Sequence, residues 1–473
     1  MSGHRIRRLD EIAPTYDVAV VGAGPAGMSA AIELARHGVS VLVIDDKASP
    51  GGQIYHGIAS SPLRPDTILG RDYWSGLDLV RRFEAAAIDC LPLASVWQIE
   101  GGRTLFVNSA GASRRIEARH IILATGALER PVPIDGWTLP GVMGVGAAQL
   151  LLKSSGVLPQ GRTVLLGAGP LLWLFASQMI AAGPPPPHVG GVGVGEAGGP
   201  GAAALEFLAS GYARKGAALI WTVRRHAKWS SVRRAKIERQ GDAFVIRTTD
   251  GGGHESEIAA DTVLVHRGIV PNLNLTRASG CAVTWDETQA CWKPVTGDFG
   301  ASTIDGIAVA GDGAGISGAR GAEHLGHLAA LGAVAALGRI DASTRERLSA
   351  QPRAQLERER RGRRFLDLFY RPSARMRAGD PDAIVCRCEE VTGQQVREVV
   401  RQTHAQGPNQ LKAFLRCGMG PCQGRYCSLT VNEIIAQERR VSPADIEPMR
   451  IRPPVKPVTL QELAALESTS FKD

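Results

Sequence analysis

Five cysteines near the C-terminal end of the sequence are close enough together to bind a metal centre. Cys386 and Cys388 form a Cys-x-Cys pair, and Cys417, Cys422 and Cys427 follow in one glycine-rich segment. Thiolates gathered around one point repel each other and need a cation to hold them, which iron–sulfur clusters or zinc supply. A tight Cys-x-Cys turn suits an iron–sulfur cluster. We therefore predict such a cluster, with zinc as the main alternative.

A glycine-rich turn near the start of the chain predicts a dinucleotide site. It consists of Gly22, Ala23, Gly24, Pro25, Ala26 and Gly27. The turn joins a strand-like run, 18–21, to a segment with helical spacing, 25–37. Gly22 permits the tight turn, Gly24 lets a pyrophosphate approach the backbone, and Gly27 lets the helix pack closely on the strand. The N-terminus of this helix then faces the phosphates with its positive end.

Several later residues extend this site. Asp45 closes the next strand, 39–44, where its carboxylate can accept hydrogen bonds from ribose hydroxyls. The further candidates are Gly51, Gly52 and Gln53 after that strand, Thr125 and Gly126 at the end of strand 121–124, and Gly311 and Asp312 after strand 306–310. In this order the motifs resemble the two-dinucleotide-domain flavoproteins that include thioredoxin reductase and ferredoxin reductases. The resemblance implies FAD as the cofactor and a contact between Asp312 and the ribityl chain.

The motif recurs at 161–183, but in an altered form. Gly167 and Gly169 match the first two glycines, whereas Leu172 replaces the third and should hold helix and strand further apart. A Pro- and Gly-rich stretch, 183–200, follows as a loop or a loosened strand, and no basic pair follows it to take a 2′-phosphate. We expect the fold of this second domain to be intact and leave its binding of NAD(P) or another nucleotide open. No Cys-x-x-Cys motif follows Gly52, which argues against a dithiol reductase.

The cysteine-containing segment resembles the [2Fe–2S] domain of the bacterioferritin-associated ferredoxin type. That family has a Cys-x-Cys pair, a helical spacer and a second cysteine pair. The resemblance implies Cys386, Cys388, Cys422 and Cys427 as ligands, with Cys417 as the alternative to Cys427.

Composition and charge restrict the remaining possibilities. The net charge is +8, but residues 345–377 hold eleven arginines against four acidic residues, so the rest of the chain is nearly neutral. A general nucleic-acid groove is therefore not expected. The uncharged segment 163–183 is long enough to span a membrane, yet its glycines and proline favour a strand, a turn and a buried helix. The N-terminus lacks the apolar run of a signal peptide, so we expect a cytoplasmic protein without a transmembrane segment.

These motifs together predict an α/β fold: a Rossmann-like FAD domain with an inserted NAD(P)-like domain, followed by a small helical [2Fe–2S] domain. The expected boundaries are 16–157 and 289–340 for the two parts of the FAD domain, 158–288 for the inserted domain, 341–380 for a basic linker, 381–440 for the [2Fe–2S] domain and 441–473 for a tail.

This order closely resembles the A subunits of opine oxidases and their relatives in D-hydroxyproline dehydrogenase and hydrogen cyanide synthase. The most specific matches are 51–55, 72–74 and 417–425. The resemblance implies an electron-transfer subunit without catalytic residues of its own. Its partner would be an amino-acid-oxidase-like catalytic subunit, with a small ferredoxin-like subunit as a further candidate partner, and the reaction would be oxidation at a CH–NH donor. The alternatives are a self-sufficient NAD(P)H-dependent ferredoxin or rubredoxin-type reductase and a binding scaffold.

Overall fold

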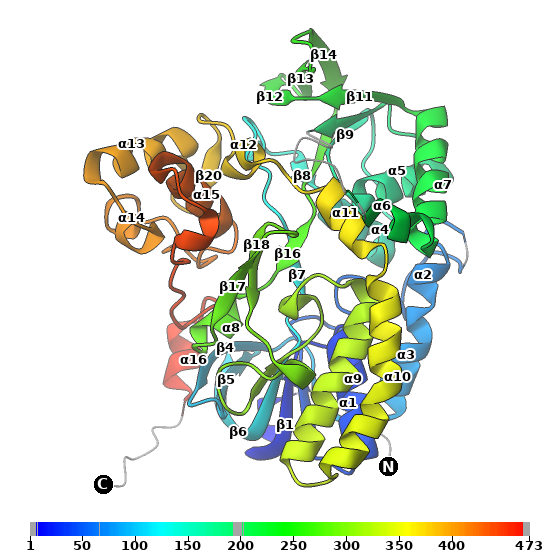
Figure 1. The fold of residues 1–473 in the computed structure, drawn as a ribbon, viewed down its shortest axis with the longest axis vertical. Coiled ribbons are helices and arrows are strands. Elements are labelled where there is room, and N and C mark those ends of the chain that lie inside the picture. Colours follow the sequence, from blue (N-terminus) through cyan, green and yellow to red (C-terminus); the bar gives the residue numbers. More distant parts are fainter. Residues whose placement is uncertain (1–5, 7, 66, 193–200, 202, 467–473) are drawn as a thin grey trace.

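The first of two large sheets occupies the lower half of the molecule (Figure 1). A computed structural model describes residues 6, 8–65, 67–192, 201 and 203–466. The strands run in the order β3-β2-β1-β6-β5-β4, and β19 also pairs with β6. They are β1 (Thr15–Val21), β2 (Val41–Ile44), β3 (Asp89–Leu91), β4 (Ser95–Glu100), β5 (Thr104–Ser109), β6 (Ala112–Leu123) and β19 (Ile307–Val309). β1, β2, β3, β6 and β19 are parallel, and β4, β5 and β6 form an antiparallel meander.

Alternate residues of β1 face two separate cores, as the period of a strand requires. Val18 and Val20 pack under α1 (Pro25–Arg36) and α9 (Gly318–Ala336), while Ala19 and Val21 pack on the opposite face. α10 (Ala342–Arg360) lies against the outer side of α9 (Figure 1). The first sheet is therefore covered on both faces, and its parallel strands end together at one edge.

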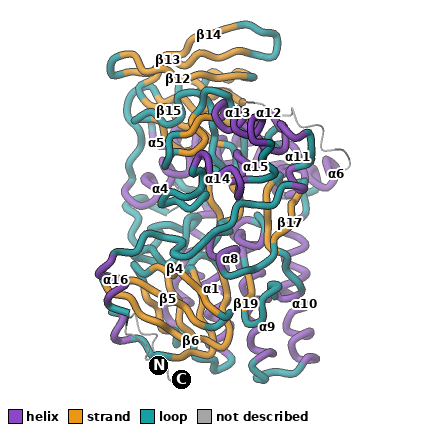
Figure 2. Tube along the Cα trace, turned by 90° about the vertical axis from the view of Figure 1, so that its left-hand side faces the viewer, coloured by secondary structure: helices purple, strands orange, loops and turns teal. Residues whose placement is uncertain are grey.

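The second sheet lies above the first and contains five parallel strands in the order β11-β10-β9-β15-β8. They are β8 (Val142–Gly144), β9 (Thr163–Gly167), β10 (His188–Val192), β11 (Lys228–Val232) and β15 (Thr262–His266). Its helices are α4 (Val145–Ser155), α5 (Pro170–Ala182), α6 (Ala203–Leu208) and α7 (Gly211–His226). An antiparallel sheet of β12 (Arg234–Gln240), β13 (Ala243–Thr249) and β14 (Glu255–Ala260) extends from its upper end (Figure 2).

The glycine-rich stretch after α5 forms a strand, the second of the two alternatives. Ideal Cβ atoms at Gly190 and Gly191 would lie 2.7 Å from Leu166 and 3.0 Å from Trp229. The glycines therefore allow close packing between neighbouring strands, which offsets their low strand propensity. Residues 193–200, the rest of the Pro- and Gly-rich stretch, lie outside the described residues.

Two short strands, β7 (Ala127–Glu129) and β16 (Ile269–Pro271), pair where the chain passes between the two sheets. The remaining elements before the cysteines are η1 (Leu9–Glu11), α2 (Arg71–Trp74), α3 (Gly76–Ala85), α8 (Asn274–Ala278), β17 (Val283–Asp286), β18 (Cys291–Pro294), η2 (Asp298–Gly300), η3 (Gly311–Ala314), α11 (Arg363–Phe369) and α12 (Ala374–Ala378). The uncharged segment 163–183 forms β9 and α5, and no helix within the described ranges is long and apolar enough to cross a membrane.

The cysteines belong to a small helical unit at the upper left of Figure 1. It contains β20 (Ile384–Cys386), β21 (Val391–Thr392), α13 (Gly393–Thr403), α14 (Pro408–Leu415) and α15 (Ser428–Arg439). The chain then continues through η4 (Pro443–Asp445) to α16 (Leu460–Ala464), beside the first sheet. Val455 donates to the Trp97 carbonyl at 3.0 Å, and Lys456 contacts Asp46 at 2.7 Å, so the tail ties the cysteine-containing unit to the first sheet.

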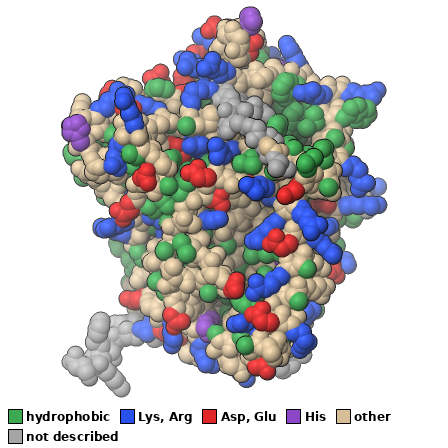
Figure 3. Space-filling model, in the orientation of Figure 1, with side chains coloured by type: hydrophobic (Ala, Val, Ile, Leu, Met, Phe, Trp, Pro, Cys, Tyr) green, Lys and Arg blue, Asp and Glu red, His purple; other side chains and the backbone are tan. Residues whose placement is uncertain are grey.

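Basic and acidic side chains are interspersed on the face shown in Figure 3. The basic stretch after α9, which we predicted as a linker, forms α10 and α11. Within α10, Arg360 pairs with Glu357 at 2.9 Å, and the guanidinium groups of Arg345 and Arg353 lie over the Phe299 ring. Part of the positive charge is therefore used in contacts within the chain.

Candidate cofactor sites

The first glycine turn is shaped by two steric requirements. Gly22 has a φ of +109°, and an ideal Cβ there would lie 2.4 Å from the Ala124 carbonyl oxygen. At Gly27 an ideal Cβ would lie 1.8 Å from the Gly22 carbonyl oxygen. Both positions therefore need glycine, the first for the close approach of β6 and the second for close packing of α1 on the turn.

Gly24 differs from these two because there is room beside it. The nearest atom to an ideal Cβ at Gly24 is the Cα of Gly52, 3.7 Å away. Gly24 is followed by Pro25 at the N-terminus of α1, where helical N–H groups are available to an anion. This arrangement fits the pyrophosphate of a dinucleotide.

Asp45 holds the turn from the end of β2. Its Oδ2 accepts a hydrogen bond from the Ala23 N–H at 2.5 Å, and its Oδ1 accepts one from the Lys47 N–H at 2.7 Å. The side chain is buried, and burial raises its pKa despite these two donors. Each oxygen keeps a second lone pair, so the carboxylate can both fix the turn and accept a ribose hydroxyl.

The Gly51-Gly52-Gln53 segment folds over the first turn. Gly51 donates to the Ala23 carbonyl at 2.8 Å, and an ideal Cβ at Gly52 would lie 2.8 Å from the Gly24 Cα. The side chain of Gln53 is exposed, while its backbone carbonyl accepts a hydrogen bond from Lys153 at 3.1 Å. This segment closes one side of the space beside Gly24.

The turn after β19 closes the other side of the space beside Gly24. An ideal Cβ at Gly311 would lie 2.6 Å from the Ala26 Cβ, so η3 packs directly on the first turn of α1. Asp312 Oδ1 accepts hydrogen bonds from the Ser317 and Gly318 N–H groups at 2.8 and 2.9 Å. Its Oδ2 has no hydrogen bond within the described part of the chain and can accept one from a ligand hydroxyl.

The Thr125-Gly126 turn after β6 is fixed by a segment from the second half of the chain. The Thr125 hydroxyl donates to the Asn272 carbonyl at 3.1 Å, and the Asn272 N–H donates to the Gly126 carbonyl at 2.9 Å. The predicted residues of the first site thus lie around the ends of β1, β2, β6 and β19. This is the edge at which parallel sheets bind nucleotides, and the arrangement fits FAD.

The five C-terminal cysteines come together in two contact groups. Cys386 contacts Cys417 and Cys427, and all three are at most 1% exposed. Cys388, which is exposed, contacts the half-buried Cys422. Two neighbouring thiol groups fit a two-iron cluster better than one tetrahedral zinc ion, which needs all ligands around one point.

Backbone N–H groups support thiolate character at this site. The N–H groups of Glu389 and Gly418 point to Cys386, and the Cys422 N–H points to Cys388. Contacts with Cys417 and Cys427, followed by these N–H groups, lower the pKa of Cys386, and the same contacts raise the pKa of Cys417 and Cys427. Burial raises the pKa of Cys388. Thiolates are the form in which cysteines bind iron, and N–H donors to sulfur tune the potential of a cluster.

The second glycine turn is partly filled by protein side chains. Leu172 occupies the position that corresponds to Gly27 and is 1% exposed. Because a Cβ at Gly27 would collide with its turn, a leucine at the corresponding position requires more room between α5 and the second turn. The buried ring of His266 also lies beside this turn, 3.1 Å from an ideal Cβ at Gly169, and its Nδ1 is 2.5 Å from Glu129 Oε1.

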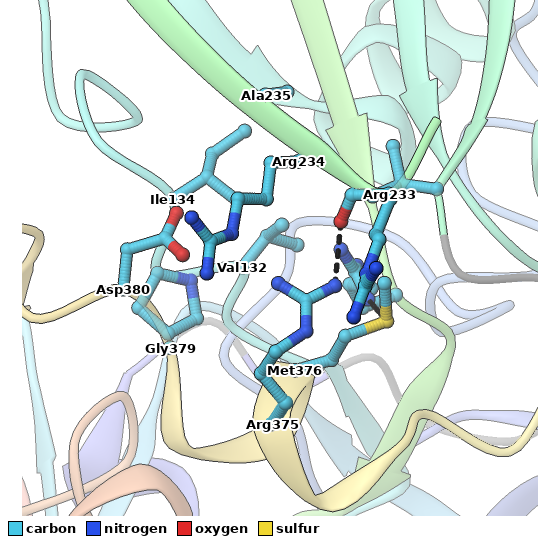
Figure 4. Close-up of a pocket in the computed structure, with 12 residues that line it drawn as sticks. Val132, Ile134, Arg233, Arg234, Ala235, Arg375, Met376, Gly379 and Asp380 are labelled. Atoms are coloured by element: carbon cyan, nitrogen blue, oxygen red, sulfur yellow. Dashed lines mark hydrogen bonds between the residues drawn. The ribbon is translucent and has the colours of Figure 1, made fainter. Parts of the chain in front are cut away.

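Sequence reasoning missed a basic pocket at the edge of the second sheet. Its wall includes four arginines from three separate parts of the sequence: Arg233, Arg234, Arg267 and Arg375. Figure 4 shows Arg375 reaching the backbone carbonyl of Arg233, with Asp380 nearby. The sequence lacks a basic pair after β10, but folding supplies positive charge there from the β11–β12 connection, the residue after β15, and α12.

One short segment connects the two predicted sites. Asn272 binds the Gly126 turn through its backbone, and two residues later the Asn274 side chain donates to the Gln423 carbonyl at 2.9 Å. Gln423 directly follows Cys422. A second contact joins the units where Trp137 Nε1 donates to the Ile384 carbonyl at 2.7 Å. The cysteine-containing unit is thus fixed against the dinucleotide-binding part.

Comparisons with known proteins agree with this architecture. Residues 16–183 match the pyridine nucleotide-disulphide oxidoreductase family, and residues 384–437 match the BFD-like [2Fe-2S] binding domain. L-proline dehydrogenase from P. horikoshii superimposes with a TM-score of 0.67 at 20% identity, covering 97% of this chain and 80% of that chain. The chain is thus a two-dinucleotide-domain flavoprotein with a C-terminal [2Fe–2S] domain, and its cofactors are FAD and a [2Fe–2S] cluster.

Sequence relatives define the family more closely. The opine oxidase A subunit of Agrobacterium tumefaciens is 45% identical over 476 residues, which cover 97% of this chain and 93% of that protein. The hydrogen cyanide synthase component HcnB of Pseudomonas aeruginosa is 32% identical, over 93% of this chain and 96% of that protein. The chain belongs to the family of opine oxidase A subunits. It is therefore one subunit of an oxidoreductase, and its relatives are parts of multi-subunit complexes.

Proposed function

We propose that this chain is the electron-transfer subunit of a heteromeric dehydrogenase that oxidises an opine or another secondary amine of the amino acid type. A partner subunit of the amino-acid-oxidase type would bind and oxidise the substrate at its CH–NH bond. Bound FAD and the [2Fe–2S] cluster supply the redox chemistry of this chain, and an external acceptor would take the electrons. The proposed setting is the cytoplasm.

The observation that carries this proposal is the short connection between the two cofactor sites. Residues 272–274 bind the Thr125-Gly126 turn at one end and the loop of Cys422 at the other, through two hydrogen bonds of 2.9 Å. A fixed path of this kind favours electron exchange within one chain over exchange between units that move independently. Cys388 is exposed, so the cluster would also have an edge open to an external redox partner.

The residues predicted for the first site include no arginine to bind the carboxylate of an amine substrate. Oxidation of an amino acid by a flavin requires the substrate carbon to be held at the flavin, and its carboxylate is commonly bound by an arginine. The residues assembled here around the strand ends are glycines, Gln53, Thr125, Asp45 and Asp312. They suit a cofactor, which supports placing the substrate in a partner subunit.

The alternative is a self-sufficient NAD(P)H-dependent reductase of the ferredoxin or rubredoxin type, favoured by the intact parallel second sheet. Leu172 and the buried His266 ring beside Gly169 argue against it. We therefore expect that NADH or NADPH, mixed anaerobically with the holoprotein, leaves the flavin absorbance near 450 nm unchanged on the timescale of turnover, about 0.1–1 s. Dithionite is the positive control. Bleaching by either nucleotide on that timescale would favour the reductase instead.

A further inference from the structure

Lys153 is a buried cation beside the first cofactor site. It lies on α4, one residue before Ser154, whose Cα would be 3.1 Å from an ideal Cβ at Gly57. This close packing against the segment after Gln53 leaves the lysine side chain 3% exposed. Its Nζ donates to the Gln53 carbonyl at 3.1 Å and is 5.8 Å from the centre of the Tyr73 ring.

No carboxylate lies within ion-pair distance of this ammonium group in the described part of the chain. The titratable groups around it are His56, which is cationic when protonated, and the Tyr73 phenol, and Lys47 lies near His56. Burial lowers the pKa of Lys153 to about 7, while the nearby Lys47 and Lys153 help to lower that of His56. A buried cation without an anionic partner is costly, and it points to an anion that is supplied from outside the chain.

The position of Lys153 identifies the source of that anion. Gln53, to which it donates, directly follows Gly52, and Gly52 packs on Gly24 in the turn that fits the pyrophosphate. We propose that Lys153 is a cofactor-binding residue whose ammonium group balances the negative charge of bound FAD. That charge resides on the pyrophosphate in both redox states and additionally on the isoalloxazine ring when the flavin is reduced to its anion.

The proposal predicts a pH dependence with a definite sign. Contact with an anion favours the ammonium form, so FAD binding raises the pKa of Lys153, and the protein takes up a proton when it binds FAD near or above pH 7. FAD should therefore bind more tightly at pH 6 than at pH 8.5. This can be measured in the unaltered protein, as FAD affinity against pH and as proton uptake in buffers of different ionisation enthalpy.

Variants separate a role in binding from a role in packing. Lys153→Met keeps the length but not the charge, and we expect about 10-fold or greater weakening of FAD binding at pH 6, with a smaller loss at pH 8.5. Lys153→Arg should remain within a few-fold of wild type. Lys412→Met is the matched control, because Lys412 also donates to a backbone carbonyl, that of Arg450, but lies in the [2Fe–2S] unit.

Two further measurements distinguish the sources of the charge. If the pyrophosphate is the anion, Lys153→Met weakens ADP binding as much as FAD binding. If the reduced ring is the anion, ADP binding is unchanged and the midpoint potential of bound FAD falls. Two results together would overturn the proposal. In Lys153→Met, the affinities for FAD and ADP and the midpoint potential of bound FAD would be unchanged. In the wild-type protein, the affinity for FAD would not vary with pH.

Discussion

Replacing Cys386 or Cys422 by serine is expected to abolish the [2Fe–2S] signal, whereas Cys417→Ser should leave most of it. Each thiol contact group contains one of these two essential residues, so removing either leaves an iron without a full thiolate set. A serine hydroxyl is a poor replacement at neutral pH. Electron paramagnetic resonance of the reduced protein, with iron and sulfide analysis, gives the readout, and retained FAD is the internal control for folding.

The same experiment tests whether Cys417 or Cys427 is the fourth ligand of the cluster. Both side chains are fully buried, and both contact Cys386. The resemblance to the ferredoxin family favours Cys427 as the ligand. A cluster that survives Cys427→Ser but is lost in Cys417→Ser would reverse the ligand assignment.

Gly24→Ala is expected to weaken FAD binding by about 100-fold, which corresponds to roughly 3 kcal/mol. Gly24 has a φ of −77°, which any residue can adopt, and the nearest atom to the added methyl group would be 3.7 Å away. The apoprotein should therefore fold normally. The methyl group would instead occupy the space through which the pyrophosphate approaches the backbone.

The comparison with Gly27→Ala and Gly216→Ala makes this test specific. At Gly27 the added carbon would collide with the Gly22 carbonyl, so that variant should lose thermal stability as well as FAD. Gly216 lies in α7 with no neighbour within 4 Å, so its replacement should leave FAD binding unchanged and raise thermal stability slightly through the better helix propensity of alanine. Wild-type FAD affinity in Gly24→Ala would show that the pyrophosphate does not pass this residue.

The dinucleotide turn could be predicted from the sequence because its requirements are local. The spacing from Gly22 to Gly27 and the position of Asp45 after an apolar strand place these residues together in any parallel α/β unit. The structure adds that the Asp45 carboxylate also binds the Ala23 N–H, so Asp45→Ala would remove a turn contact as well as a ribose contact. Variants at Asp45 therefore test the site less cleanly than Gly24→Ala.

Lys153 could not be predicted in this way. A lysine near the C-terminal end of an amphipathic helix is usually exposed, and its burial depends on packing against residues about a hundred positions earlier. The basic pocket of Figure 4 has the same origin, because its arginines meet only after folding. The glycine-rich strand β10 was ambiguous for a related reason: its low propensity is overcome by contacts with Leu166 and Trp229.

The cysteine segment shows the limit of spacing arguments. Cys417 and Cys427 lie on either side of Cys422 at similar separations, so spacing alone could not assign one of them to the cluster. The fold brings both against Cys386, and the two-group arrangement is a property of three-dimensional packing. The two-group arrangement therefore helps to distinguish an iron–sulfur cluster from zinc. It does not decide whether Cys417 or Cys427 is the ligand.

The most direct test of the central claim is a dye-linked dehydrogenase assay of the purified holoprotein with opines, D-hydroxyproline and glycine, with and without a coexpressed partner of the amino-acid-oxidase type. An electron-transfer subunit should show no turnover alone and should turn over at about 1 s⁻¹ or faster in the complex. The Cys386→Ser variant in the same complex should reduce the external acceptor poorly, which tests the path through the cluster. Turnover of any of these amines by the chain alone, at about 1 s⁻¹ or more, would contradict the account.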